Sequence, residues 1–333
     1  MSRGILPFVV RRLLFLPVVL FAVSIVTFAL GRYGPGDPVE VRAGARADPL
    51  VVEQIREDLG LNDPFLVQYG RYMGNLVQGD LGDSISKPGF TVAELVGPAL
   101  WISIQLNLVA LFIVFALGIP IGVLSALKRG TWVDPASIST FLFFQSIPVV
   151  VAIPILLYVF VLQLGWLPTS GWHGLFEVHN PIDGVLYIPF IDFHLVIPVL
   201  VLSIPGVAGL ARLMRATTLQ ALEEDYVRTA RAKGLAEFSV ISRHVARNAL
   251  LPITTVIGFS LVGILEGAFF VEFLYGIPGV GQLAIDSVFA RDYDVIMALT
   301  ILVASAFVVM NVLIDIAYTF IDPRVRLEDA GDR

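Results

Sequence analysis

The sequence has 333 residues, of which 56% are hydrophobic and 15% are charged, whereas soluble domains are about 45–50% apolar and about 25% charged. This composition excludes an ordinary water-soluble domain, and the net charge of −6, with no basic stripe, excludes a nucleic-acid-binding protein. The absence of cysteine excludes disulfides, thiolate metal sites and a cysteine nucleophile.

Apolar runs long enough to cross a membrane recur along the chain. A bilayer core of about 30 Å needs roughly 20 apolar residues in a helix, because only helices and closed barrels satisfy every backbone polar group there. The runs cover residues 13–30, 98–127, 137–164, 194–214, 250–274 and 295–320. The predicted fold class is therefore all-α, a polytopic membrane protein with six transmembrane helices.

The first run follows Arg11 and Arg12, as the apolar core of a secretory signal would. The apolar stretch is longer than the usual core of a signal peptide, and no clear small-residue cleavage pattern follows it. We therefore expect a retained signal anchor.

Basic residues are distributed unevenly between the two sides of the predicted membrane. Six spans place both termini on one side, and most of the 22 Lys and Arg residues lie on that side. Those on the other side are concentrated in the long 32–97 segment, where the positive-inside rule has little force. The pattern predicts that both termini are cytoplasmic.

The 32–97 segment is predicted to form two short amphipathic helices. The first apolar stripe ends before Gly60, and Pro64 is expected at the first position of the second helix. The stripes consist of Val51, Val52, Ile55 and Leu59, and of Phe65, Tyr69, Tyr72, Met73 and Leu76. They pack on the outer ends of the spans, form a docking surface for an external partner, or do both.

Proline and glycine mark two features inside the spans. Pro148 and Pro154 are expected to break the third span, which either kinks it or frees carbonyl groups to line a cavity. Glycines four residues apart favour close packing of helices, with or without sliding. These pairs are Gly118 with Gly122 and Gly263 with Gly267.

The loops after the third and fifth spans carry no standard ligand pattern. The 165–193 segment contains His173, Glu177, His179 and Asp183, but their spacing fits no known metal site, so we expect no metal on this chain. Residues 276–294 are expected to form turns followed by a short re-entrant or surface helix.

The sequence has no catalytic motif. A phosphate-binding loop needs a Lys followed by Ser or Thr after a glycine-rich run, whereas Lys87, Lys128 and Lys233 are followed by Pro, Arg and Gly. A zinc-protease motif, a nucleophile elbow and a pair of intramembrane carboxylates are also missing. We therefore expect no ATPase site and no hydrolase site.

The segment between the fourth and fifth spans, about 220–252, is polar and strongly helical. Gly234 is predicted to end one helix, after which a second begins. The expected apolar face consists of Leu235, Phe238, Val240, Ile241 and Val245. Such an element either inserts into a groove on a partner protein or lies on anionic lipid.

This segment resembles a known motif. Arg228-Thr229-Ala230, then Gly234 and Leu251-Pro252, resemble the EAA loop of bacterial binding-protein-dependent ABC importers, in which the loop docks on the ATPase subunit. Arg228 and Thr229 stand where Glu and Ala are usual. Residues 225–235, 78–82, 276–279 and 322–324 look like the dipeptide and oligopeptide permease branch, so the resemblance covers nearly the whole chain.

The resemblance implies an architecture and a set of partners. The fold would be a type I ABC importer transmembrane domain, with an N-terminal helix and extracytoplasmic segment over 1–97 and a five-helix permease core over 98–333. The partners would be a second homologous permease subunit, two ATPase subunits that hold ATP and Mg, and an extracytoplasmic solute-binding protein, in the bacterial inner membrane. The implied ATPase-coupling residues are Asp225, Arg228, Thr229, Ala230, Gly234, Leu235 and Pro252.

Two acidic residues lie within the predicted spans. Glu266 either lines the substrate path or is paired within the bundle, and Asp315 is expected to pair with a nearby base. The expected function is an importer subunit for di- or oligopeptides. Alternatives are a nickel, glutathione or antimicrobial-peptide importer of the same branch, a gradient-driven secondary transporter, for which no inverted repeat is found, and a membrane scaffold.

Overall fold

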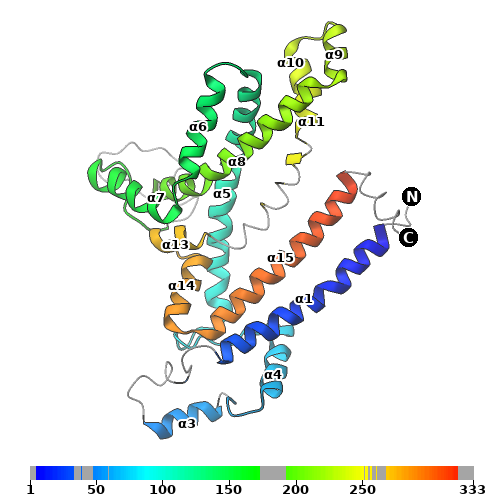
Figure 1. Ribbon diagram of the computed structural model, residues 1–333. Helices are drawn as coiled ribbons and strands as arrows, with labels where there is room; N and C mark the ends of the chain where they lie inside the picture. Colours follow the sequence, from blue (N-terminus) through cyan, green and yellow to red (C-terminus); the bar gives the residue numbers. More distant parts are fainter. Residues whose placement is uncertain are drawn as a thin grey trace. The chain divides into compact units, whose positions relative to one another are not determined.

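The computed structural model describes residues 5–33, 48–58, 60–172, 193–250 and 268–321, with a few single residues between these ranges. Within them the chain is helical (Figure 1), and the extended residues pair only in an isolated bridge between Asp83 and Thr91. The chain divides into two compact units. Unit 1 comprises Met1–Trp101 and Gly279–Arg333, and unit 2 comprises Ile102–Pro278.

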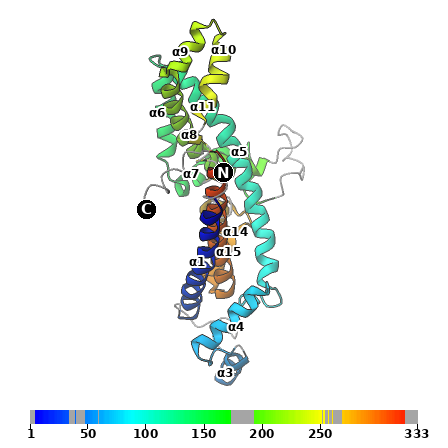
Figure 2. The same cartoon turned by 90° about the vertical axis from the view of Figure 1, so that its right-hand side faces the viewer.

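Unit 1 is built on two long helices, α1 (Ile5–Tyr33) and α15 (Tyr293–Ile321). They lie side by side in both views of the chain (Figures 1 and 2). A Cβ added at Gly31 of α1 would lie 2.8 Å from the Met297 sulfur of α15. The missing side chain of Gly31 therefore permits the close approach of the two helices.

Two short helices follow α1, as the sequence predicts. They are α3 (Pro49–Asp58) and α4 (Phe65–Val77). Gly60 has a φ of +62°, so it makes the turn between them in a conformation that favours glycine. Pro64 precedes the first residue of α4 and does not occupy the first helical position, a difference of one residue at the boundary.

The aromatic stripe of α4 packs on α1. Tyr69 is buried, and the Phe28 ring of α1 lies 5.4 Å from the Phe65 ring and 5.5 Å from the Tyr69 ring, between centroids. The Ser24 and Tyr69 hydroxyl oxygens are 2.7 Å apart. The predicted packing of this stripe on the first span is confirmed.

The start of α5 (Val92–Leu127) packs on α14 (Val280–Ala290) and α15. The turn and short helix expected over 276–294 are confirmed, since Gly276 has a φ of +70° and α14 follows. The buried side chains of this cluster are Val92, Val96, Ala99, Val280, Val295, Ala298 and Leu299.

In unit 2 the third apolar run is a broken helix. It consists of α6 (Val133–Gln145), α7 (Val149–Leu156) and the π-helical segment η1 (Leu157–Gln163). Pro148 lies at the break in an extended conformation, with φ −60° and ψ 139°. Pro154 lies inside α7, just before η1, where its missing N–H removes one helical hydrogen bond. The predicted break is confirmed at Pro148, whereas α7 continues through Pro154.

The second half of α5 packs closely against α8 (Val196–Glu223), which follows the short 3₁₀ turn η2 (Phe193–Leu195). A Cβ added at Gly118 would lie 3.0 Å from the Leu210 side chain, and one added at Gly122 would lie 2.5 Å from the Ala211 carbonyl oxygen. The close-packing face predicted at these glycines is confirmed. Gly263 and Gly267 lie outside the described residues.

A compact set of short helices follows α8. It comprises α9 (Asp225–Ala232), α10 (Glu237–Ser239), the π-helical segment η3 (Val240–Ala246) and α11 (Arg247–Ala249). Farther along, α13 (Phe269–Tyr275) completes the described helices of unit 2. Most of the predicted fifth span lies outside the described residues.

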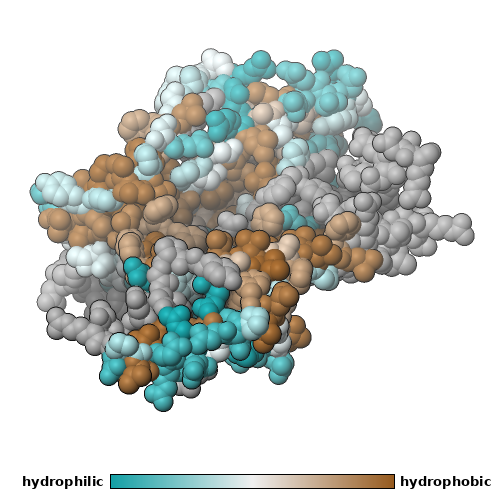
Figure 3. All heavy atoms as spheres, turned by 60° about the horizontal axis from the view of Figure 1, so that its bottom comes forward, coloured by the Kyte–Doolittle hydropathy of each residue, from teal (hydrophilic) through white to brown (hydrophobic). Residues whose placement is uncertain are grey.

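Three helical stretches of the described chain are long and apolar enough to cross a membrane, or four if α13 and α14 count as one bent span. They are Val92–Leu127, Phe193–Glu223 and Tyr293–Val312, and shorter apolar stretches occupy Pro17–Arg32 and Val149–Gln163. Figure 3 shows apolar side chains over a large part of one face. Exposed large apolar residues on α1 and α5 include Phe21, Leu30, Trp101, Phe112 and Leu117. Such surface needs an apolar solvent, as a polytopic membrane protein has.

Candidate functional site

The candidate site is the segment from α9 to α11, residues 225–250, which we call the α9–α11 segment. Only Glu224 separates it from the end of α8. α9 ends at a tight corner, where the Gly234 amide donates to the Arg231 carbonyl oxygen at 2.9 Å. Gly234 has a φ of +77°, a conformation that a Cβ disfavours. The glycine corner predicted from the sequence is confirmed.

The inner face of the segment is packed firmly against α8. Val227 and Ala230 of α9 and Val240 and Val245 of η3 are buried. Their cluster includes Leu210, Met214 and Ala221 of α8, together with Ala249 and Ile253. The segment and the end of α8 therefore share one buried core.

The outer face of the segment exposes apolar side chains at the corner. Phe238 is 84% exposed, and Leu235 is exposed as well. The predicted apolar face is therefore divided: Val240 and Val245 are buried in the core of the chain, whereas Phe238 and Leu235 are exposed. Leu235 lies in the turn, and Phe238 precedes Val240 by two residues in one helical stretch, which places their side chains on opposite faces.

Charged side chains surround this apolar tip. Arg231 holds Glu237 through two hydrogen bonds, Nε to Oε2 at 3.2 Å and Nη2 to Oε1 at 2.6 Å. The Arg231 guanidinium keeps the pKa of Glu237 below its ordinary value. Arg228 lies 3.4 Å from Asp225, and both side chains are largely exposed. Exposed pairs of this kind are weak, so the Arg228 guanidinium can exchange Asp225 for a group on a partner.

The structure brings most of the predicted coupling residues together. Asp225, Arg228, Thr229 and Ala230 lie on α9, and the Thr229 hydroxyl donates to the Asp225 carbonyl oxygen at 2.9 Å. Gly234 and Leu235 form the corner. Pro252 lies just beyond α11 and is exposed.

Several other predicted positions lie outside the described residues. Glu266 is one of them, and Asp315 lies on α15 where side chains are not described. The segment with the possible metal ligands, 173–183, is also outside the described ranges. Within those ranges no group of three or more His, Asp or Glu side chains is placed to hold a metal.

The described chain contains a buried acid of the membrane region that sequence reasoning missed. Glu272 on α13 is fully buried and accepts hydrogen bonds from the Ser103 hydroxyl at 2.7 Å and the Ala268 amide at 3.1 Å. The sequence singles out Glu266 because it lies inside the fifth apolar run. Glu272 lies near the end of that run, and the serine that would have identified it is 169 residues away in sequence.

A second missed carboxylate, Asp292, lies in unit 1 between α14 and α15. It is fully buried and accepts hydrogen bonds from the Ser84 hydroxyl at 2.5 Å, the Ser86 hydroxyl at 2.7 Å and the Ser86 and Ile85 amides. Burial alone would raise the pKa of Asp292, but these hydrogen bonds outweigh it and leave the pKa below its ordinary value. Asp292 thus fastens the loop after α4 to the start of α15.

A small cleft of about 220 Å³ lies beside this anchor in unit 1, lined in part by Phe28, Arg32, Tyr72, Asp80 and Met297. Its volume is below the roughly 300 Å³ at which small-molecule pockets begin. Burial and the nearby Asp294 carboxylate raise the pKa of Tyr72 to about 12, so its hydroxyl stays protonated.

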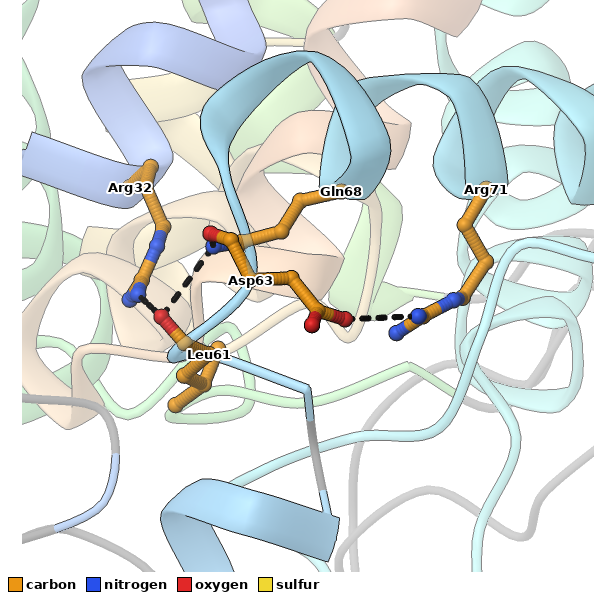
Figure 4. A network of polar contacts seen from close by, with 5 residues as sticks. All are labelled: Arg32, Leu61, Asp63, Gln68 and Arg71. Atoms are coloured by element: carbon orange, nitrogen blue, oxygen red, sulfur yellow. Dashed lines mark hydrogen bonds and ion pairs between the residues drawn. The ribbon is translucent and has the colours of Figure 1, made fainter.

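One rim of this cleft is held by the polar network of Figure 4. Arg32 and Gln68 donate to the Leu61 carbonyl oxygen, and Gln68 also donates to that of Asp63 at 2.6 Å. Arg71 binds the Asp63 carboxylate at 2.8 Å. These contacts join α1 to the turn before α4, so the arginines here serve the fold.

Comparison with known proteins gives matches over almost the entire chain. A family described as binding-protein-dependent transport system inner membrane component matches residues 118–327, and its N-terminal companion family matches residues 5–114. An oligopeptide transport system permease protein of Bacillus subtilis is 38% identical and covers 96% of the chain and 98% of the relative.

Other similar proteins extend this picture. A di/tripeptide transport system permease protein of Pseudomonas aeruginosa is 38% identical over 96% of the chain and 99% of the relative. A probable peptide ABC transporter permease protein of Sinorhizobium fredii is 37% identical over 96% of the chain and 99% of the relative. Among solved structures, the inward-facing MetNI methionine ABC transporter matches 68% of the chain and 96% of its own, at 16% identity and a TM-score of 0.49.

Proposed function

Because the chain belongs to the family of binding-protein-dependent transport system inner membrane components, we propose that it is the permease subunit of an ATP-driven importer of di- or oligopeptides. The peptide substrate is supported by full-length relatives that are named as peptide, oligopeptide and di/tripeptide permeases. The subunit spans the inner membrane several times and acts within a transporter complex. In our proposal both of its termini are cytoplasmic.

The partners in this proposal are a second homologous permease subunit, two ATPase subunits and an extracytoplasmic solute-binding protein. ATP and Mg would be held by the ATPase subunits, and this chain would supply the transport path and the coupling to ATP hydrolysis. The path would run between the two permease subunits. Glu266 remains our candidate for lining it.

The exposed tip of the α9–α11 segment is the observation that carries the proposal. Phe238 offers an aromatic side chain to a groove, and Arg228 of the same segment offers an exposed guanidinium. Aromatic and Arg side chains are the groups that dominate binding energy at protein interfaces. We therefore assign the docking of an ATPase subunit to this tip, with Asp225, Thr229 and Pro252 at its margin.

The rigid attachment of the tip to α8 provides the mechanism of coupling. When the ATPase subunits close on ATP, they would displace the tip, and the buried core shared with α8 would carry the displacement into the membrane helices. Alternating access then follows from movement of helices around the path. In this scheme the chain itself moves no proton and breaks no bond.

The test is to co-express the chain with the genes adjacent to its own and to purify the complex through a tag on this chain. The expected result is co-purification of an ATPase subunit with vanadate-sensitive ATP hydrolysis. Phe238→Ala should weaken ATPase binding by roughly tenfold or more, as expected for an interface anchor. Phe90→Ala removes an exposed aromatic from the loop after α4 and should change nothing. If no ATPase subunit associates with the wild-type chain, the importer assignment is wrong.

A further inference from the structure

A polar cluster joins three helices of unit 2 near the end of α8. The Asp134 carboxylate of α6 accepts two hydrogen bonds from Arg215 of α8, from Nε to Oδ1 at 2.5 Å and from Nη2 to Oδ2 at 2.6 Å. The Ser125 hydroxyl of α5 donates to Asp134 Oδ1 at 2.9 Å. We call these three residues the Asp134 cluster. Its bidentate geometry fixes the relative orientation of α6 and α8 as well as their separation.

Burial makes this cluster different from an ordinary surface ion pair. The Asp134 side chain is 10% exposed and that of Arg215 is 23% exposed. A second pair, Arg129 with Glu223, connects the end of α5 to the end of α8, but its side chains are 63% and 72% exposed and 3.3 Å apart. Exposed pairs contribute little, whereas parting a buried pair leaves charges without compensation. The exposed pair is therefore a matched control for the buried one.

The backbones of α5 and α8 are in close contact at Gly122. A Cβ at Gly122 would lie 2.5 Å from the Ala211 carbonyl oxygen and 2.6 Å from the Met214 Cβ atom. Both contacted residues lie within four positions of Arg215. Ser125 lies one helical turn beyond Gly122, so the cluster adds α6 to a pair of helices that are already in close contact.

The cluster is also close to the site of coupling. Arg215 precedes the last residue of α8, Glu223, by eight residues, which at 1.5 Å per residue is about 12 Å. Over this distance α8 is a continuous helix, and beyond it the α9–α11 segment shares a buried core with Met214 and Ala221. A displacement of the segment therefore reaches Arg215 through continuous secondary structure.

We propose that Asp134, Arg215 and Ser125 are positioning residues that make α5, α6 and α8 move together with the α9–α11 segment, an inference that rests on the function proposed above. Packed helices can move past one another by small shear displacements. A bidentate ion pair whose side chains are 10% and 23% exposed cannot follow such a displacement without losing its geometry and leaving a largely buried carboxylate uncompensated. The cluster thus converts displacement of the segment into displacement of the α5–α6 hairpin.

The test uses the assembled importer in sealed lipid vesicles, with its ATPase subunits and binding protein. Asp134→Asn keeps the shape and the Ser125 contact but removes the charge, and Glu223→Gln does the same to the exposed pair. The measured quantities are the rate of ATP hydrolysis and the amount of peptide imported per ATP. Asp134→Asn should lower peptide import per ATP by about fivefold or more, the lower end of typical coupling effects. Glu223→Gln should leave this ratio unchanged.

A conservative variant separates positioning from folding. Arg215→Lys keeps the charge but cannot form the bidentate pair, so its import per ATP should fall between those of the wild type and Asp134→Asn. Equal assembly of all variants, judged by co-purification of the ATPase subunits, shows that each is folded. A role in folding alone would lower assembly and leave import per assembled ATPase unchanged, and that result would overturn the inference.

A distance measurement tests the movement directly. The chain has no cysteine, so Lys128→Cys, in the turn between α5 and α6, and Lys233→Cys, at the corner after α9, provide two unique positions for spin labels. Their separation should stay constant between the nucleotide-free and ATP-bound complex in the wild type and change in Asp134→Asn. A change in the wild type would overturn the inference. If the wild-type complex neither assembles nor imports peptide, the proposed function fails, which is a different outcome.

Discussion

Two buried aspartates, one in each unit, are held by opposite kinds of partner. Asp292 is surrounded by neutral donors, the hydroxyls of Ser84 and Ser86 and two amides of the same loop. Asp134 is held by the guanidinium of Arg215. The neutral donors all belong to the 84–86 loop, so Asp292 holds that loop in place. The charged partner of Asp134 lies on α8, so the pair joins α6 to α8. The difference agrees with the proposal that Asp134 transmits movement between helices, whereas Asp292 orders a loop.

The largest expected effect on stability comes from removing Arg215, the charged partner of Asp134. Arg215→Met leaves Asp134 buried without compensation, so the free energy of unfolding should fall by about 3 kcal/mol. The change can be followed through the four tryptophans of the chain by thermal unfolding in detergent. Adding Asp134→Leu to Arg215→Met should restore most of the loss, because the pair is replaced by apolar side chains. Failure of the double variant to recover would show that the charge itself is not the cause.

Asp292→Ala should have a smaller and more local effect. It leaves several donors of the 84–86 loop without a partner, so we expect a loss of about 2 kcal/mol. Hydrogen exchange should accelerate at residues 84–86 before it changes elsewhere. Asp286→Ala, at an exposed position on α14, is the matched control. Uniform acceleration of exchange across the chain would show that Asp292 does not act on the 84–86 loop alone.

Acid should weaken the attachment of the 84–86 loop by Asp292. The hydrogen bonds lower the pKa of Asp292 in the folded state, so its stabilisation is fully present above the ordinary aspartate pKa of about 3.9 and is lost as pH falls toward the folded value. The amides of the 84–86 loop should therefore lose protection against hydrogen exchange, relative to the intrinsic rate at each pH, below about pH 4. In Asp292→Asn this acid dependence should disappear. Its persistence in the variant would assign it to another group.

The smallest expected effect concerns the exposed pairs. Glu237→Gln removes the partner of Arg231, and Glu223→Gln removes that of Arg129. Surface pairs are screened by water and salt, so neither variant should shift thermal unfolding measurably. A shift comparable with that of Arg215→Met would mean that pairing matters irrespective of burial.

Local signals in the sequence predicted much of the fold and of the candidate site. The apolar runs predicted the long helices, Pro148 predicted the break after α6, and Gly234 predicted the corner of the α9–α11 segment. Each is decided by neighbours within a few residues, which is where helix length, proline and glycine act.

Partners distant in sequence could not be predicted in this way. Arg215 and Asp134 are 81 residues apart, and Ser84 and Asp292 are 208 apart. No local pattern selects one acid among many for such a partner, because the choice depends on how the helices pack. The division of the apolar face after Gly234 depends on tertiary packing in the same way: the pattern groups Phe238 with Val240, and only the packing on α8 buries Val240 and leaves Phe238 exposed.

The exposed Phe238 ring has a consequence for how assembly of the complex can be observed. In a chain without its partner the ring is 84% exposed. In the function proposed above an ATPase subunit covers it, so assembly would transfer this ring from water into an interface. The change in its surroundings would report assembly without any label.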